Sequence, residues 1–183
     1  MSTQTIKQQV PAGTYAVDPV HSSITFAITH NGVATFRSGF SDYEARLTGG
    51  EAPALEGSVD VSSIEVDDEQ LKGHLLSPDF FDASRYPRAS FRSSELSVAD
   101  DGSVLLRGEL EIRGEVREVE ASGKFGQLGA DLAGNARIGL SIAATVDRRN
   151  FGLAWNAELP SGGEVLDYAV AVAVELELVE EVE

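Results

Sequence analysis

The chain has 183 residues, of which 42% are hydrophobic, so it can form one domain with a substantial core. Its formal charge of −16, from 30 acidic residues against 14 Lys and Arg, repels phosphate backbones and anionic membranes and argues against a nucleic-acid partner. It has no cysteine, which excludes disulfides, a thiolate nucleophile and thiolate metal sites.

The first residues are polar and end in Pro11-Ala12-Gly13, so we expect a flexible N-terminal arm over residues 1–13. We expect residues 14–183 to form a single domain. The start, MSTQTIKQQV, lacks the apolar stretch of a signal peptide, which predicts a cytoplasmic protein. No run approaches the roughly 18 apolar residues of a membrane helix, so stable membrane insertion is not expected.

Alternating polar and apolar residues predict β-strands in the first third of the chain. Ile24, Phe26 and Ile28 share one face of a half-buried strand, and Asn31-Gly32 then signals a turn. The phase of the alternation changes further on, which predicts a bulge near Ser41-Asp42. The strands expected in this part span residues 15–18, 22–29, 36–47 and 56–64.

Residues 67–87 form the one long interruption of the strand pattern. Acidic side chains at residues 67–69 suit the first turn of a helix, and Leu71 and Leu75 begin a short apolar stripe. Pro78 ends the helix because it pushes the preceding residue out of the α region. Phe80-Phe81 then needs an apolar cover, so we interpret this stretch as a helical connector that plugs one end of a β-structure.

The strand pattern resumes after the connector and is clearest from Val104 to Arg113. Asp100-Asp101-Gly102 before it predicts a hairpin turn. In the last strand, valines and leucines at even positions share one face, and the alanines at 169, 171 and 173 lie on the other. Those alanines could line a cavity or face outward. The strands expected here span residues 88–98, 104–113, 117–126, 138–146 and 165–178.

About eight strands joined by short turns and one helical crossover predict an all-β fold with an antiparallel sheet. Eight strands can close into a barrel that holds one small ligand, although a two-sheet sandwich fits the pattern equally well. Small residues on otherwise apolar faces would leave room inside a barrel, unless neighbouring side chains fill the space. These residues are Gly108, Ala121, Gly123 and Ala144.

Few residues offer chemistry. His21, His30 and His74 are far apart and show no HxH or HExxH spacing, so no metal site is predicted. There is no GxSxG motif and no glycine-rich phosphate loop, so neither a catalytic site nor a cofactor is predicted. Arg148-Arg149 stands out in an acidic chain: it is either a solvated, ion-paired turn or a site for an anionic head group at the mouth of a pocket.

Several motifs, in order along almost the whole chain, resemble those of the YceI-like family. The connector carries the clearest similarity, and each of the other motifs is weak by itself. The matching segments are DPVHSS at 18–23, HNGV at 30–33, Arg37, Phe40, HL at 74–75, Ser77, DFFD at 79–82, YP at 86–87, GELEIRG at 108–114, DR at 147–148 and FGL at 151–153.

This resemblance implies an extended, eight-stranded, lipocalin-like antiparallel barrel with a long apolar pocket for polyisoprenoids or other amphiphiles, and it implies homodimers. Without a leader, the chain looks like a cytoplasmic branch of the family. The strong negative charge argues against a diphosphate head group, and a neutral isoprenoid such as a quinone side chain fits equally well.

We therefore expect a non-enzymatic protein that carries, stores or sequesters an isoprenoid or other long-chain lipid. One alternative is an enzyme that acts on such a lipid with His21 or His74 as general base. The other is a stress-response interaction module with an apolar outer patch on the last strand. The residues expected to contact the ligand chain are Phe26, Ile28, Phe91, Leu110, Ile142 and Trp155, with Arg148 or Arg149 at the head group.

Overall fold

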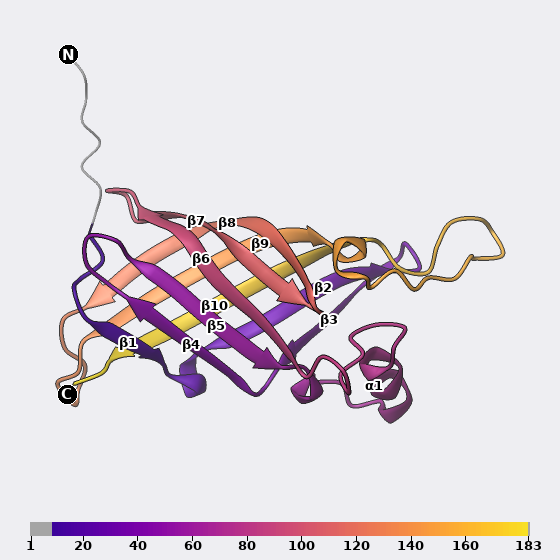
Figure 1. The fold of residues 1–183 in the computed structure, drawn as a ribbon, viewed down its shortest axis with the longest axis horizontal. Helices are drawn as coiled ribbons and strands as arrows, with labels where there is room; N and C mark the ends of the chain where they lie inside the picture. The colour runs from indigo at the N-terminus through magenta and orange to yellow at the C-terminus, as the bar shows by residue number, and fades with distance from the viewer. Residues whose placement is uncertain (1–8, 183) are drawn as a thin grey trace, which may run out of the picture.

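A computed structural model describes residues 9–182, which form a long barrel of strands with one α-helix at one end (Figure 1). Three short 3-10 turns interrupt the chain at Pro19–His21 (η1), Val61–Ser63 (η2) and Arg148–Phe151 (η3). The helix α1 spans Glu69–Leu76. The strands are β1 (Thr14–Val17), β2 (Ser23–His30), β3 (Ala34–Phe40), β4 (Tyr43–Thr48), β5 (Ala54–Asp60), β6 (Arg88–Val98), β7 (Ser103–Ile112), β8 (Glu115–Leu128), β9 (Arg137–Asp147) and β10 (Ala169–Glu180).

The sheet closes on itself because β1 pairs with both β4 and β10. All strand pairs are antiparallel, in the order β1-β4-β5-β6-β7-β8-β9-β10, and β10 also pairs with β2. β1 and β2 both pair with β10, one after the other along its length, and so share one position in the barrel. β4, which pairs with β1, and β3, which pairs with β2, share the next position. The ten strands therefore fill eight positions. The predicted eight-stranded antiparallel barrel is confirmed, and a sandwich is excluded.

Two local features split these long strands. Asp18 caps η1 by accepting a hydrogen bond from the backbone N–H of Val20, which separates β1 from β2. The expected irregularity near Ser41-Asp42 is a complete break between β3 and β4. There the Ser41 N–H donates to the Ser63 carbonyl, and the Asp42 N–H donates to Ser63 Oγ.

The last strand starts four residues later than its alternation predicts, at Ala169 instead of Val165. Two side chains account for this: Arg148 Nε donates to the carbonyl of Asp167, and Asn156 bonds both the N–H and the carbonyl of Leu166. Because these backbone groups bond to side chains, they do not join the ladder with β9. This rearrangement was invisible to the alternation pattern.

The barrel is filled at the end that holds β1 and the C-terminus. Leu47 and Leu178 are 0% exposed there, and Tyr15 is buried over them. Val10 is also buried in this core, and its carbonyl accepts a hydrogen bond from the Gly50 N–H. The described part of the expected arm, residues 9–13, therefore packs on the barrel, whereas residues 1–8 lie outside the described residues.

The helical connector covers the opposite end, away from β1 and from the end of β10 (Figure 1). Asp68 caps α1 through a 2.7 Å hydrogen bond from the Leu71 N–H, and the helix ends at Leu76, with Ser77 as an extended C-cap before Pro78, as predicted. Leu75 and Phe80 pack in a second cluster with Phe151 and Leu153, the residues that follow β9. No helix within residues 9–182 is long and apolar enough to cross a membrane.

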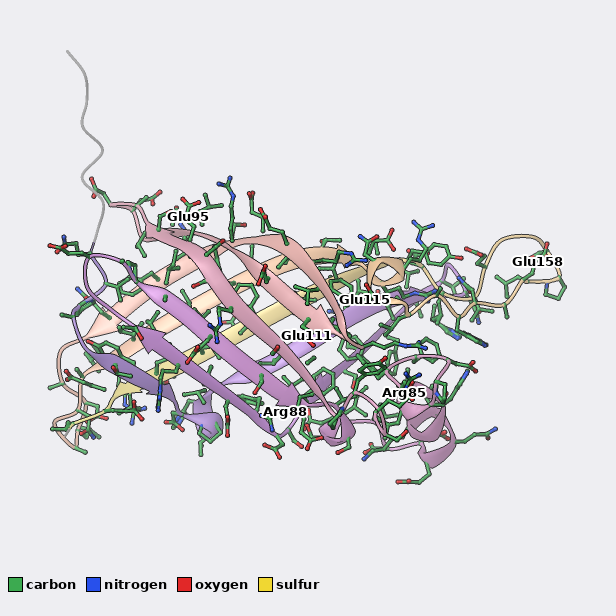
Figure 2. The ribbon with its side chains drawn as sticks, viewed as in Figure 1. Arg85, Arg88, Glu95, Glu111, Glu115 and Glu158 are labelled. Atoms are coloured by element: carbon green, nitrogen blue, oxygen red, sulfur yellow. The ribbon has the colours of Figure 1, made fainter. Side chains whose placement is uncertain are left out.

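Charged side chains cover the outside of the wall. Figure 2 shows Arg88, Glu95 and Glu111 projecting outward from β6 and β7, and all three are exposed. Ala89, Leu96 and Leu110, each next to one of them in sequence, point inward, as the alternation predicts for a closed wall. Most of the charged side chains thus lie on the surface, and the buried exceptions among the described residues are Asp82 and Arg148.

Candidate ligand-binding cavity

A cavity of about 720 Å³ lies inside the barrel, between the filled end and the α1 connector. This volume is within the usual range of small-molecule sites. Its walls are apolar side chains of the strands, and the connector contributes Leu71, Leu75, Phe80 and Phe81. Wall residues such as Phe91 and Leu110 point inward yet are only half-buried, because the space that they face is not filled by protein.

Aromatic rings line one side of the cavity from the wall to the connector. Phe26 lies 6.4 Å from Phe36 and 5.9 Å from Phe40, measured between ring centroids. Phe40 in turn meets Phe81 edge-on at 6.0 Å. This series joins β2 and β3 to the connector, so the connector is part of the cavity wall.

The four small residues noted in the sequence play two different roles. Ala121 and Ala144 line the cavity and leave space in it. Gly108 and Gly123 instead let other groups approach: a side chain at Gly108 would collide with the ring of Phe91, and one at Gly123 with the carbonyl of Ser141. Two of the four residues therefore leave free space, as predicted, and at the other two neighbouring groups fill it.

Polar side chains gather at the connector end of the cavity, which we call the mouth. His74 Nε2 lies 3.0 Å from Asp79 Oδ2, and the imidazole meets Trp155 edge-on at 4.8 Å between centroids. His30, at the end of β2, also lines the cavity and is exposed. His21 is far from the mouth, on the outer surface beside Asp18.

Arg148 is a buried cation at the cavity wall, only 4% exposed. Nη1 donates to the carbonyls of Leu153 (2.6 Å) and Trp155 (2.8 Å), and Nε donates to that of Asp167. Burial lowers the pKa of the Arg148 guanidinium. The arginine thereby fastens the loop that carries Trp155, and its Nη2, with a single 3.5 Å bond to Leu166, is its least committed nitrogen.

Arg149 points elsewhere. Its side chain forms an ion pair with Asp147 at 2.6 Å and lies over the Tyr168 ring, 4.0 Å from the centroid. Asp147 raises the pKa of this guanidinium through a hydrogen bond. Since successive residues of η3 point in different directions, Arg148 turns inward and Arg149 stays on the surface.

The structure brings seven of the eight predicted ligand-binding residues to one cavity and leaves out Arg149. The sequence-based prediction missed the ring series and the mouth. Phe36 and Phe40 share one parity in their strand, which was a usable signal. The residues on the cavity wall are Phe26, Ile28, Phe91, Leu110, Ile142, Arg148 and Trp155, and those missed include Phe36, Phe40, His74, Phe81 and Val119.

A second hollow, of about 780 Å³, lies outside the barrel over β8, β9, β10, β2 and β3. Ala171 and Ala173 of β10 and Ala143 of β9 line it and are exposed. The alanine face of the last strand therefore lies on the outer surface, while its valine face lines the interior.

A charge cluster holds the filled end of the barrel together. Arg137 bonds Asp131 (2.6 Å), Asp18 (2.9 Å) and Glu177 (2.6 Å). The pKa values of Asp18 and Asp131 are both lowered to about 2; hydrogen bonds from His21 and then Arg137 act on Asp18, and Arg137 acts first on Asp131. Although Asp18, His21 and Glu177 lie close enough together to hold a metal ion, the Arg137 guanidinium already binds both carboxylates.

An eight-position antiparallel barrel that is filled at one end and hollow at the other is the architecture of lipocalin-like ligand-binding barrels. The chain belongs to the YceI-like family, whose domain matches residues 15–179.

Two relatives match this chain over more than three quarters of its length. A UPF0312 protein of Pseudomonas aeruginosa is 28% identical over 151 residues, 79% of this chain and 78% of its own. A UPF0312 protein of Vibrio cholerae is 26% identical over 148 residues, 78% of each chain.

Solved structures show the same fold. BcnA of Burkholderia cenocepacia matches with a TM-score of 0.76 at 20% identity, over 88% of this chain and 98% of that one. A polyisoprenoid binding domain from Saccharophagus degradans, implicated in plant cell wall breakdown, matches with a TM-score of 0.71 at 15% identity, over 91% and 98% of the two chains.

Proposed function

We propose that the protein binds one long apolar or amphiphilic ligand, an isoprenoid or related lipid or quinone, inside the barrel for carriage, storage or sequestration. The observation that carries this proposal is a large apolar cavity at the centre of a YceI-like barrel. A structural neighbour that is a polyisoprenoid binding domain supports the ligand class.

The driving force would be burial of the ligand chain, at about 25 cal/mol per Å² of apolar surface. The chain would contact Phe26, Ile28, Phe91, Leu110 and Ile142. The wall offers this chain no unsatisfied polar group: among residues 9–182, every buried side-chain nitrogen or oxygen already has a hydrogen-bond partner. The chain would thus displace water from apolar surface without breaking polar contacts.

The head group would stay at the mouth, beside Trp155 and within reach of Arg148 Nη2. A head group with a neutral acceptor oxygen, such as a quinone or an alcohol, fits one spare N–H donor better than a diphosphate does. Arg149 would take part only if its side chain left Asp147.

The test is organic extraction of protein purified from its own host, followed by mass analysis, with native mass spectrometry of the intact protein alongside. We expect one apolar ligand per cavity. An empty protein that also fails to bind an added long-chain prenol would contradict the proposal and favour the interaction module, for which the exposed alanine face of β10 is the candidate surface.

We further propose that binding involves no chemical conversion. The enzyme alternative now depends on His74, because this histidine lines the cavity and pairs with Asp79. His21 lies outside the cavity. If the extracted lipid is recovered unchanged after incubation with the protein, and a His74→Ala variant retains the same lipid, the enzyme alternative fails.

The homodimer and the cytoplasmic location belong to the same proposal. Sedimentation of the intact protein measures the first, and fractionation of host cells measures the second.

A further inference from the structure

We infer that five side chains form a floor that sets the longest ligand chain this barrel can enclose; the inference rests on the proposed function. The floor consists of Ala45, Leu55, Leu106, Ile142 and Leu176. Each lines the cavity and each also belongs to the packed core of the filled end. They come from β4, β5, β7, β9 and β10, so they surround the lumen on several sides.

Below the floor the barrel has no room for a ligand. Leu47 and Leu178 are 0% exposed, Ile138 is 1% exposed, and Tyr15 and Val10 close the end at 2% each. Protein cores are packed as densely as organic crystals, and an added methylene forces neighbours out of place. A ligand chain that reaches Leu106 must therefore stop there.

The other end of the ligand is fixed by polarity. His30, His74 and Arg148 line the cavity at the mouth, whereas the five floor side chains are apolar and the glutamates beside them, Glu44 and Glu56, are exposed. An amphiphile would enter tail first and leave its polar group at the mouth. The head group is held at the mouth and the tail ends at the floor. The distance between mouth and floor therefore limits the length of the chain that the cavity can enclose.

The cavity volume gives the length. At roughly 30 Å³ for each carbon-sized group, the volume that one water takes in the liquid, about 720 Å³ holds about 24 carbons, or four to five isoprene units. A longer chain would leave its excess outside the mouth in water. Affinity should therefore rise with chain length up to this limit and then stay level.

The experiment measures the affinity of the intact protein for geraniol, farnesol, geranylgeraniol and solanesol, prenols of two, three, four and nine isoprene units. Displacement of the fluorescent probe N-phenyl-1-naphthylamine provides the readout. We expect at least a tenfold gain for each unit up to geranylgeraniol, since every buried methylene adds to affinity. From geranylgeraniol to solanesol, which adds five units, we expect no more than the gain of one unit, because only about four further carbons fit.

Two variants move the floor. Ala45→Leu adds three carbons at the floor and should therefore weaken solanesol binding at least tenfold while leaving farnesol within threefold. Leu106→Ala should deepen the cavity and increase the difference in affinity between solanesol and geranylgeraniol. Ala173→Leu is the matched control, because Ala173 faces outward on β10 and lines only the outer hollow. If one of the two variants fails to fold, the other decides alone.

The two failures can be told apart. If the prenols bind but Ala45→Leu weakens solanesol and farnesol equally or not at all, the floor does not limit chain length and the inference is overturned. If no prenol binds to the unmodified protein, the proposed function itself is wrong.

Discussion

The ring of Phe91 lies over Gly108, its diagonal neighbour on β7, so closely that a Cβ atom at position 108 would be 2.6 Å from Phe91 Cζ. The same Cβ would collide with the carbonyl of Arg92. The Phe91 ring thereby occupies the space that a side chain at position 108 would fill. A large ring and a glycine on adjacent strands fit together in this part of the cavity wall.

We therefore expect Gly108→Ala to destabilise the protein by about 1–3 kcal/mol, because backbone and ring must both move. Urea unfolding measures this change. Gly126→Ala on β8 is the matched control, since a Cβ atom there meets nothing within 4 Å. Equal unfolding midpoints for the two variants would show that the wall yields at Gly108 without cost.

Regular alternation predicted the barrel well because each inward residue of a closed wall has an outward neighbour. It could not predict what Arg148 does, since the guanidinium acts through backbone carbonyls of residues that are distant in sequence. For the same reason the start of β10 was placed too early. Which small residues leave space was also hidden: Ala121 and Gly108 look alike in the pattern, but only the structure shows that a ring lies over Gly108.

Arg113 ties the connector to the barrel. Its Nη1 donates to the carbonyls of Phe80 (2.9 Å) and Gly152 (3.0 Å) from the turn between β7 and β8. In Arg113→Lys a single ammonium replaces the planar guanidinium, so we expect a loss of about 1–2 kcal/mol and faster release of N-phenyl-1-naphthylamine. Stopped-flow displacement measures that release.

Arg92→Lys is the control for Arg113→Lys. Arg92 is exposed, and its only ion pair among the described residues is long, 3.9 Å to Glu56. Surface pairs of this kind contribute little. Similar release rates for both lysine variants would mean that the attachment of the connector does not control release of the bound probe.

The Arg137 cluster makes a prediction for acid. Asp18 and Asp131 ordinarily titrate near 3.8, and their pKa values in the folded protein are about 2. A carboxyl group whose pKa is lower in the folded protein adds stability at pH values above its pKa in the unfolded chain. This stability is lost as pH falls through its pKa in the folded protein. The urea midpoint should therefore drop between about pH 4 and pH 2, and Arg137→Met should flatten this drop.

His21 titrates in the opposite sense. A hydrogen bond and the charge of Asp18 raise the pKa of this imidazole above its ordinary 6.5. The stability that protonated His21 adds is therefore fully present below the pKa of the imidazole in the unfolded chain. It is lost as pH rises through the higher pKa of the folded protein. The urea unfolding midpoint of His21→Gln should be lower than that of the unmodified protein at about pH 5 and equal to it at about pH 9. A pH-independent difference would assign His21 a packing role.

Trp155 can report on the cavity, because it is the only tryptophan and its ring lies at the mouth between His74 and Phe80. A chain that passes the mouth must come into contact with this ring. We expect 9,10-dibromostearate, whose bromine atoms quench indole, to lower the fluorescence in a saturable way, and geranylgeraniol to restore it. A Trp155→Phe protein carrying a Phe36→Trp exchange places the reporter on another part of the cavity wall and should show the same response. Saturable binding of N-phenyl-1-naphthylamine without any quenching in either protein would place the bound chain outside the barrel, most simply in the outer hollow over β9 and β10.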